Sequence, residues 1–252
     1  MIVFFNPLST TPGKQPLPLS IMALAAILEG RESWRLVDGN VEANPARAIL
    51  DRIADGSGSQ PDLLAVTVMP GPQLAQAVPV CKAIRAARPH LKIVWGGYFP
   101  TQHADTVLAS GLVDFVVRSQ GEQPLLGLIA ALKGECPFET VGSLTWCRAD
   151  GSIVKNAAGP MTALDELPEY PYESVEMEHY IHPTYLGQRT VAHNSSFGCP
   201  FACSFCAVGA MTNRRWLAQS AARVSVTLER LQRQYGVDSV MMHDMEIGRA
   251  HV

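Results

Sequence analysis

The chain has 252 residues, of which 47% are hydrophobic, enough to bury one large core or two ordinary ones. A formal net charge of −3, without a run of Lys or Arg, gives no reason to invoke nucleic acid as a partner. The start lacks a basic stretch and reaches Pro7 too early for a secretion signal, and no apolar run approaches the ~20 residues that span a bilayer. We therefore expect a cytoplasmic globular protein without a membrane span, whose cysteines are thiols or metal ligands rather than disulfides.

Residues 1–134 alternate short apolar runs with segments of helical periodicity, which is the pattern of a parallel sheet covered by helices on both faces. Asn44 is predicted to cap one helix ahead of Pro45, and Cys81 lies on an apolar helix face that places it in the core. The pattern predicts an α/β domain with a five-stranded parallel sheet. Its strands are expected at residues 2–5, 34–38, 63–68, 92–95 and 113–117.

The loops after these strands are the place to search for a ligand, because ligands of an open parallel sheet bind beyond the carboxyl ends of its strands. Residues 69–72 are Met-Pro-Gly-Pro after the third strand, and Gly96-Gly97 follow the fourth. A pair of glycines lets a flat or bulky ligand approach the backbone closely, although a tight turn alone also explains it. A dinucleotide is a poor candidate, because no G-x-G-x-x-G follows the first strand.

Residues 135–189 lose this periodicity and become rich in Pro, Gly, Tyr and acidic residues, so we interpret them as a linker. Within the linker, two apolar runs flank Asp150-Gly151, which predicts a β-hairpin. Cys136 and Cys147 are isolated in this segment, which argues against a second metal cluster.

Half of the cysteines fall inside eight residues, where Cys199, Cys203 and Cys206 have the spacing C-x-x-x-C-x-x-C. Thiolates are soft ligands for zinc, copper and iron–sulfur clusters, and a compact loop puts three of them within reach of one inorganic centre. A structural zinc needs a fourth ligand, whereas a 4Fe-4S cluster can leave one iron open for another molecule. The spacing therefore favours an iron–sulfur site.

This motif, with the aromatic Phe205 just before the last cysteine, resembles the signature of the radical S-adenosylmethionine enzymes. The resemblance implies that Cys199, Cys203 and Cys206 bind three irons of a 4Fe-4S cluster. It further implies that the fourth iron chelates S-adenosylmethionine, whose cleavage yields a 5'-deoxyadenosyl radical, and that the backbone around Phe205 contacts the adenine. Partners implied by the family are a small-molecule substrate and an electron donor such as ferredoxin or flavodoxin. A three-cysteine zinc knuckle and accidental clustering are the alternatives.

Around the motif, residues 190–246 are predicted to contain a strand at 190–193, a helix between a Ser220 cap and Gly236, and a strand at 237–243. By the same resemblance this is the start of a radical S-adenosylmethionine β/α domain, a partial TIM barrel.

Asp244 and Glu246 follow the second of these strands, where radical enzymes hold the amino group of S-adenosylmethionine, so both are candidates for that contact. Residues 247–252 show no pattern that continues the fold and match the translation of a common sequencing adapter. We interpret these six residues as a non-native read-through tail on a C-terminally truncated fragment.

With the radical motif downstream, residues 1–134 resemble a cobalamin-binding domain of flavodoxin-like, Rossmann-like fold. Thr67-Val68-Met69 stands where that family has S-x-L, and the glycine pair follows at the usual kind of distance. The D-x-H-x-x-G element of the family is absent from this sequence. The resemblance therefore implies that cobalamin is held without a protein histidine bound to cobalt. The absence also fits a domain that has lost the cofactor. The implied cobalamin contacts are Thr67, Met69, Pro70, Gly71, Gly96 and Gly97.

The sequence as a whole predicts a cobalamin-dependent radical S-adenosylmethionine enzyme, present as a fragment that we expect to be inactive alone. Reactions of the family include methyl transfer, rearrangement and cyclisation, and residues that contact the substrate are not identified. The alternative is a non-catalytic module that binds cobalamin or zinc.

Overall fold

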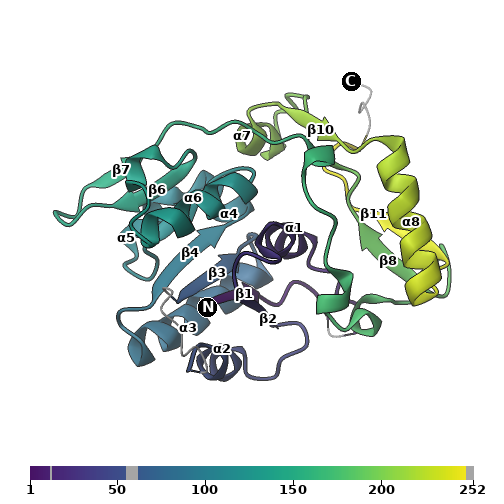
Figure 1. Ribbon diagram of the computed structural model, residues 1–252, viewed down its shortest axis with the longest axis horizontal. Coiled ribbons are helices and arrows are strands. Elements are labelled where there is room, and N and C mark those ends of the chain that lie inside the picture. Colours follow the sequence, from purple (N-terminus) through teal and green to yellow (C-terminus); the bar gives the residue numbers. More distant parts are fainter. Residues whose placement is uncertain (12, 55–61, 248–252) are drawn as a thin grey trace. The chain divides into compact units, whose positions relative to one another are not determined.

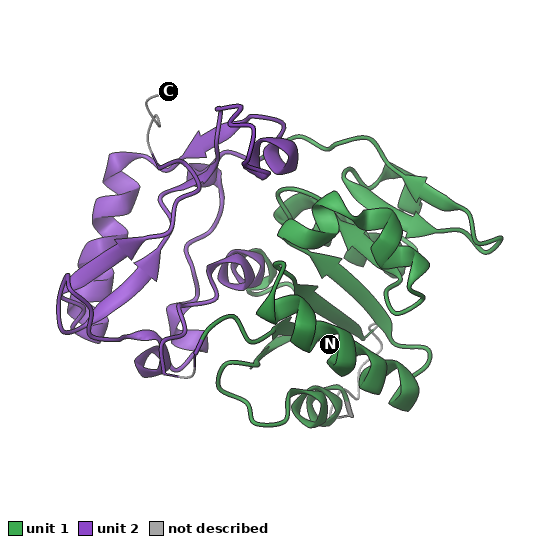
Figure 2. Ribbon diagram, turned by 180° about the vertical axis from the view of Figure 1, so that it is seen from behind, with its two compact units in different colours: residues 1–10, 27–161 green, residues 11–26, 162–252 purple. Residues whose placement is uncertain are grey.

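The computed structural model describes residues 1–11, 13–54 and 62–247. It contains two compact units, one formed by Met1–Thr10 with Ile27–Met161 and the other by Thr11–Ala26 with Thr162–Val252 (Figure 2). The division falls after Met161, whereas the sequence suggested boundaries after residues 134 and 189. Of the predicted tail at 247–252, only the exposed Ile247 lies among the described residues.

The strands of the first unit form one sheet (Figure 1). Within the described residues it has seven strands in the order β2-β1-β3-β4-β5-β6-β7; the pairs from β2 to β5 are parallel, and β6 and β7 are antiparallel. The strands are β1 (Ile2–Asn6), β2 (Trp34–Asp38), β3 (Leu63–Thr67), β4 (Lys92–Gly96), β5 (Phe115–Val117), β6 (Leu144–Cys147) and β7 (Ile153–Lys155). The helices are α2 (Pro45–Ala54), α3 (Pro72–Ala87), α4 (Tyr98–Gln102), α5 (Ala104–Ala109), α6 (Glu122–Leu132) and the short η1 (Phe138–Thr140), and α1 (Leu19–Leu28) is divided between the two units.

The parallel sheet predicted from the sequence is confirmed, with its strands at the expected positions. β1, β3 and β5 are apolar and almost wholly buried, as parallel strands covered by helices are, whereas the edge strand β2 is partly exposed at Trp34, Arg35 and Leu36. On one face Phe5, Leu64 and Ile93 pack with Ile49 of α2 and Ile84 of α3, and all five side chains are fully buried.

Two local predictions are also confirmed in this unit. The Asn44 side chain accepts a hydrogen bond from the backbone N–H of Arg47 at 3.1 Å and so caps α2. Cys81 lies in the core on α3, where burial raises the pKa of its thiol to about 11. A buried neutral thiol of this kind packs as a small apolar side chain.

The β-hairpin forms where the sequence predicts it, but it continues the sheet instead of lying in a linker. Phe115 of β5 pairs with Trp146 of β6, and the Phe138 ring lies 5.2 Å from Phe115 and 5.3 Å from Trp146 between ring centroids. Without this pairing β5 would leave an open edge of unpaired backbone groups. The hairpin therefore belongs to the first unit.

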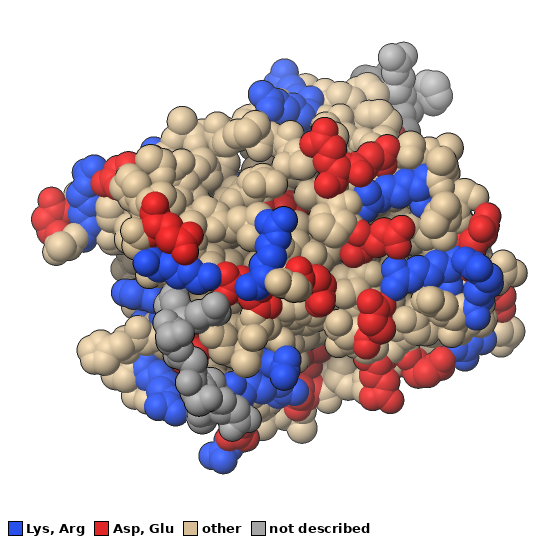
Figure 3. Space-filling model, viewed as in Figure 1, with Lys and Arg blue, Asp and Glu red and all other residues tan. Residues whose placement is uncertain are grey.

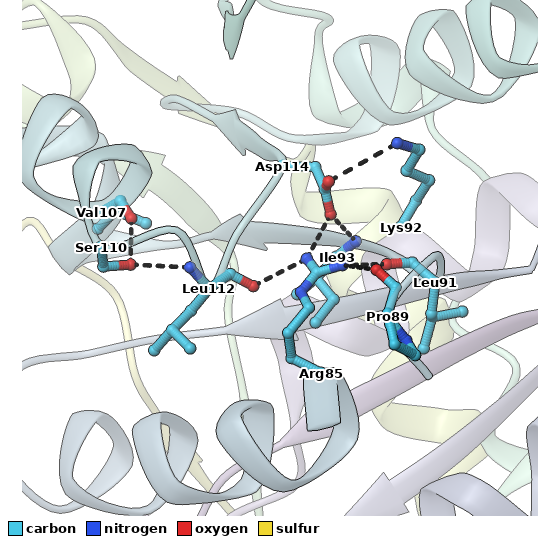
Figure 4. A network of polar contacts seen from close by, with 9 residues as sticks. All are labelled: Arg85, Pro89, Leu91, Lys92, Ile93, Val107, Ser110, Leu112 and Asp114. Atoms are coloured by element: carbon cyan, nitrogen blue, oxygen red, sulfur yellow. Dashed lines mark hydrogen bonds and ion pairs between the residues drawn. The ribbon is translucent and has the colours of Figure 1, made fainter. Parts of the chain in front are cut away.

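At the amino ends of β4 and β5, Arg85 joins three segments of the chain (Figure 4). Its guanidinium donates to the carbonyls of Leu91 and Leu112 at 2.8 and 3.0 Å and to Asp114 Oδ2 at 2.7 Å. The same carboxylate oxygen accepts the backbone N–H of Ile93 at 2.9 Å. The charged pair therefore fixes the end of α3 to the starts of both strands.

The second unit contains a parallel strand–helix–strand arrangement and a short hairpin. In the parallel arrangement, Ser220 Oγ accepts the backbone N–H of Arg223 at 3.3 Å, and Gly236 ends the helix with a φ of 63°, as the sequence predicts. The elements are β8 (Thr190–His193), β9 (Ser196–Gly198), α7 (Val208–Thr212), β10 (Trp216–Ala218), α8 (Ala221–Tyr235), β11 (Ser239–Met242), η2 (Leu164–Glu166), η3 (Tyr172–Ser174) and η4 (Met177–Tyr180).

The core of this unit includes Tyr172 from η3, Val191 from β8 and Leu231 from α8. Leu17 and Met22 also pack in it, which explains why the segment around α1 belongs to the second unit rather than to the first. The sequence analysis did not separate this segment from the first domain.

Acidic and basic side chains are interspersed on the face of the molecule shown in Figure 3. Ion pairs within one unit include Arg47 with Asp51 at 2.9 Å and Arg230 with Glu173 at 2.7 Å. Among the described residues, no helix combines the length and apolar character needed to cross a bilayer.

Candidate functional site

A buried polar network joins the loops that follow β1, β2 and β3. Asp38, the last residue of β2, accepts hydrogen bonds through Oδ1 from the side-chain amides of Asn6 at 3.1 Å and Asn40 at 2.7 Å. Gln73, in the first turn of α3, donates to Asn6 Oδ1 at 3.1 Å and accepts the backbone N–H of Met69 at 2.8 Å. Asn6 and Asp38 are each 5% exposed. The network therefore fixes the predicted ligand loop at Met69 to its neighbours.

A second layer of contacts extends this network. Gln76 Oε1 accepts the backbone N–H of Leu8 at 2.6 Å, and Asn40 Oδ1 accepts that of Ser9 at 2.8 Å. A Cβ added at Gly39 would lie 2.2 Å from Gln76 Oε1, so this position has no room for a side chain unless Gln76 moves. The sequence did not allow us to predict these side chains as a network. The only indication in the sequence was that polar residues follow the ends of the predicted strands.

The structure brings the predicted loops after β3 and β4 together. The backbone N–H of Val68 donates to Gly96 O at 2.9 Å, and that of Phe99 donates to Val68 O at 3.0 Å. Gly97 has a φ of 97°, and a Cβ added there would lie 3.2 Å from Thr67 Oγ1. Both the backbone angle and the close approach therefore require glycine at position 97.

The predicted cobalamin contacts differ in exposure along this edge. Met69, Pro70 and Gly71 are exposed, with 51% of Met69 accessible, whereas Gly96 and Gly97 are half-buried. Gly71 has a φ of 90° with no atom within 4 Å of an added Cβ, so its backbone borders open space. An exposed, glycine-containing rim of this kind suits the approach of a flat, bulky ligand.

Glu122 begins α6 and is 7% exposed. Burial raises the pKa of its carboxyl, and hydrogen bonds from backbone groups of Glu122 and Gly121 oppose that shift. The residue lies in the first turn of the helix, where a carboxylate is favoured by the positive helix end.

The three motif cysteines lie on the loop between β9 and α7, residues 199–206, which we call the cysteine loop. Their thiols are free; Cys199 and Cys203 are half-buried and Cys206 is exposed. The backbone N–H of Cys206 donates to Cys203 O at 3.0 Å and closes a turn. Across the described parts of the chain, no group of three or more His, Cys, Asp or Glu side chains is arranged to hold a metal ion.

The base of the cysteine loop is formed by the β9–β10 hairpin, which the sequence analysis missed. Gly198 pairs with Trp216 and has a φ of 87°, and a Cβ added there would lie 2.2 Å from Arg215 O. Asn213 and Arg214 also have positive φ angles, of 51° and 56°, where the chain turns from α7 into β10. Phe205, near the tip of the loop, is 87% exposed.

Asp244 lies just after β11 and is directed at the start of this hairpin. Its Oδ1 accepts the backbone N–H groups of Ser195 at 2.9 Å and Ser196 at 2.6 Å and the Ser196 hydroxyl at 2.9 Å. Its Oδ2 accepts the Ser195 hydroxyl at 2.8 Å. Glu246, the other predicted contact to S-adenosylmethionine, is half-buried two residues later. The two serines were missed as partners because 48 and 49 residues separate them from Asp244.

His193 ends β8 and is 1% exposed. Burial lowers the pKa of its imidazole, and the charge of Asp244 opposes that shift. Neither ring nitrogen has a hydrogen-bond partner among the described residues, and the same holds for Gln219 Oε1.

Comparison with known proteins matches both units. Residues 7–129 match the family model of the B12 binding domain. A relative from Synechocystis sp., anaerobic magnesium-protoporphyrin IX monomethyl ester cyclase, is 27% identical over 241 residues, which cover 94% of this chain and 46% of that protein. The chain spans less than half of the length of the curated relatives that it matches.

Two solved structures share the fold over nearly the whole chain. The cobalamin-dependent S-adenosylmethionine radical enzyme OxsB, with aqua-cobalamin and S-adenosylmethionine bound, superposes with a TM-score of 0.78 at 20% identity, covering 97% of this chain and 34% of OxsB. The radical S-adenosylmethionine methyltransferase TsrM from Kitasatospora setae, with cobalamin and a [4Fe-4S] cluster bound, gives 0.73 at 17% identity, covering 97% of this chain and 47% of TsrM.

Proposed function

Because residues 7–129 match the B12 binding domain and the chain is a relative of the cobalamin-dependent radical S-adenosylmethionine enzymes, we propose that it binds both kinds of cofactor. In this proposal the first unit holds cobalamin, and the cysteine loop of the second unit holds a 4Fe-4S cluster and S-adenosylmethionine. The reaction is methylation or cyclisation of a small organic substrate in the cytoplasm, with electrons from a donor such as ferredoxin or flavodoxin. The whole reaction belongs to the longer proteins that this chain resembles.

The carboxyl edge of the first sheet supports the cobalamin part of the proposal. The rim at Met69, Pro70 and Gly71 is exposed, Gly97 allows a close approach to the backbone, and a buried network fixes both loops. When bound, cobalamin supplies a cobalt centre that can carry a methyl group. The chain's own residues orient the corrin by backbone and side-chain contact, with no histidine from a D-x-H-x-x-G element to reach the cobalt.

The chemistry of the donor set supports the cluster part. Cys199, Cys203 and Cys206 are free thiols on one short loop, the first two half-buried and the third exposed, and three soft thiolates suit iron–sulfur ligation. When bound, a 4Fe-4S cluster with S-adenosylmethionine supplies a one-electron route to a carbon radical. Phe205 and Glu246 are the residues proposed to contact S-adenosylmethionine.

One observation carries the proposal: a single chain combines a B12 binding domain at residues 7–129 with a C-x-x-x-C-x-x-C loop at 199–206. The zinc alternative explains the cysteines but leaves the B12 binding domain without a role. A cobalamin-binding module explains that domain but leaves the three-thiol loop unexplained.

The test is anaerobic reconstitution with iron and sulfide, followed by absorbance and electron paramagnetic resonance of the reduced sample. We expect the parent chain to give the brown colour and the spectrum of a 4Fe-4S cluster. Alanine at Cys199, Cys203 or Cys206 should abolish or cripple this signal, whereas the control Cys136→Ala should retain it, because Cys136 lies in the other unit. Equal iron in all four variants would contradict the proposal.

The cobalamin part is tested separately by titration with hydroxocobalamin. The parent should bind it, and Gly97→Val should bind it more weakly, because the added side chain meets Thr67 and a φ of 97° strains a branched residue. A matched control is Gly151→Val, at a φ of 84° in the β6–β7 turn with no atom within 4 Å of the added Cβ. Equal loss in both variants, or no binding by the parent, would contradict the cobalamin site.

A further inference from the structure

Ser195 and Ser196 take up most of the hydrogen-bonding capacity of Asp244. Oδ1 accepts three of their donors and is saturated, and Oδ2 accepts one, which leaves room for at most one further donor on Oδ2. Contacts of this kind to a charged oxygen are stronger than those between neutral groups. The negative charge of Asp244 is therefore already compensated within the chain.

The segment that Asp244 binds leads directly into the cysteine loop. Ser196 begins β9, which ends at Gly198, and Cys199 follows at once. Ser195 is also held from the other side, because its carbonyl accepts the backbone N–H of Gln219 at 2.8 Å. Immediately before Asp244, the backbone N–H of His243 donates to His193 O at 2.8 Å and continues the pairing of β8 with β11. The turn between β8 and β9 is thus fixed by two different strands.

We propose that Asp244 is a positioning residue that sets the direction in which β9 delivers Cys199, and that it does not bind the amino group of S-adenosylmethionine. The inference rests on the proposed function, because Cys199 matters here as a ligand of the proposed 4Fe-4S cluster. The contact to the amino group is then left to Glu246. Asp244 acts on the cluster only through Ser195 and Ser196.

The same strand offers a matched control at its other end. Asp238, just before β11, accepts the backbone N–H groups of Gln188 and Arg189 at 3.0 Å each, ahead of β8. The bond from Arg189 lowers the pKa of the Asp238 carboxyl. Each aspartate therefore holds two successive N–H groups next to β8, but only Asp244 holds the segment that leads to the cysteines.

The experiment compares Asp244→Asn with Asp238→Asn, first in iron-free protein. Alkylation of Cys199 by iodoacetamide is followed by mass spectrometry, together with amide hydrogen exchange at residues 195–196. In Asp244→Asn we expect both rates to rise about tenfold or more, because the closed segment loses at least one hydrogen bond to a charged group. In Asp238→Asn both rates should stay at the parent value. Similar increases in both variants would mean general loosening and would overturn the proposal.

Reconstituted protein gives the second readout. Asp244→Asn should hold less iron than Asp238→Asn at equal folded fraction, measured by circular dichroism. If Asp244→Asn holds iron like the parent but its cluster spectrum no longer changes on adding S-adenosylmethionine, the residue contacts the cofactor and the proposal is wrong. If Asp244→Asn does not fold, Ser196→Ala tests the same contact, and parent-like alkylation of Cys199 in it refutes the idea.

The two proposals fail in distinguishable ways. A parent chain that takes up no iron refutes the proposed function, while the alkylation comparison, which needs no iron, still decides whether Asp244 orients the loop. If the parent takes up iron, and Asp244→Asn has the same rate of Cys199 alkylation and the same iron content as the parent, only the positioning role is refuted.

Discussion

Gln73→Leu is the substitution that tests most directly how the carboxyl edge of the first sheet is held. The variant keeps the approximate volume of a buried side chain but removes the bonds to Asn6 Oδ1 at 3.1 Å, Pro7 O at 3.3 Å and Met69 N at 2.8 Å. Asn6 is 5% exposed, so its oxygen would be left buried without this donor.

The magnitude follows from these three contacts. An unpaired buried polar atom costs roughly 1–3 kcal/mol, and each lost hydrogen bond at a half-buried site about 0.5–1 kcal/mol. Together they predict a fall in the free energy of unfolding of about 2–5 kcal/mol. The variant also frees the loop at Met69, so binding of hydroxocobalamin would have to order that loop again. Ordering costs about 1–2 kcal/mol of conformational entropy per residue, which predicts at least a tenfold weaker affinity for hydroxocobalamin.

Urea unfolding and hydroxocobalamin titration measure the two effects. The control is Gln123→Leu, because Gln123 is also the second residue of its helix but is exposed. We expect the control to match the parent in both measurements. A Gln73→Leu variant with the stability and cobalamin affinity of the control would refute the role given to this network.

Three further substitutions test other parts of the structure. Gly198→Ala should lower the free energy of unfolding, measured in urea, by about 2–4 kcal/mol, because the added Cβ lies 2.2 Å from Arg215 O and a φ of 87° strains alanine. The control Gly151→Ala has a similar φ of 84° but no atom within 4 Å of the added Cβ, so it should cost only about 1 kcal/mol. Arg85→Met should cost about 1–3 kcal/mol by the same assay, since it removes the donor to the partly buried acceptors of Leu112 and Asp114 that Figure 4 shows, and an unchanged midpoint would count against that clamp. Because burial raises the pKa of Glu122, the folded state holds its proton more tightly than the unfolded state, so this contribution to stability is present below the ordinary pKa of 4.5 and is lost as the pH rises through the folded-state pKa. Glu122→Gln should therefore gain stability relative to the parent as the pH rises above 4.5, and parallel pH profiles would show this reasoning to be wrong.

Features that a short window of sequence encodes were predictable. The parallel strands were found because most of them are short apolar runs between helical segments, and the caps at Asn44 and Ser220 because a cap depends on residues within one turn. The cysteine loop was singled out from its spacing and from the neighbouring Phe205, and its role as a cluster site stays a prediction. The match of residues 7–129 to the B12 binding domain confirms the resemblance stated for the first half.

Features that depend on distant partners were not predictable. The β6–β7 hairpin was predicted, but its pairing with β5 was not. That pairing depends on β5 lying at the edge of the sheet, which cannot be read from a short stretch of sequence. The β9–β10 hairpin has strands of three residues, too short to show a period. Gln73 and Asp244 act across 67 and 49 residues, so their polar partners are visible only in the folded chain.

The central claim is that one chain binds both cobalt in a corrin and an iron–sulfur cluster. The most direct measurement is metal analysis of the chain after anaerobic incubation with hydroxocobalamin, iron and sulfide and removal of unbound material. The account predicts about one cobalt and about four irons per chain, with the iron lost in Cys203→Ala and the cobalt kept. One zinc per chain with no iron, or iron that survives in Cys203→Ala, would contradict it.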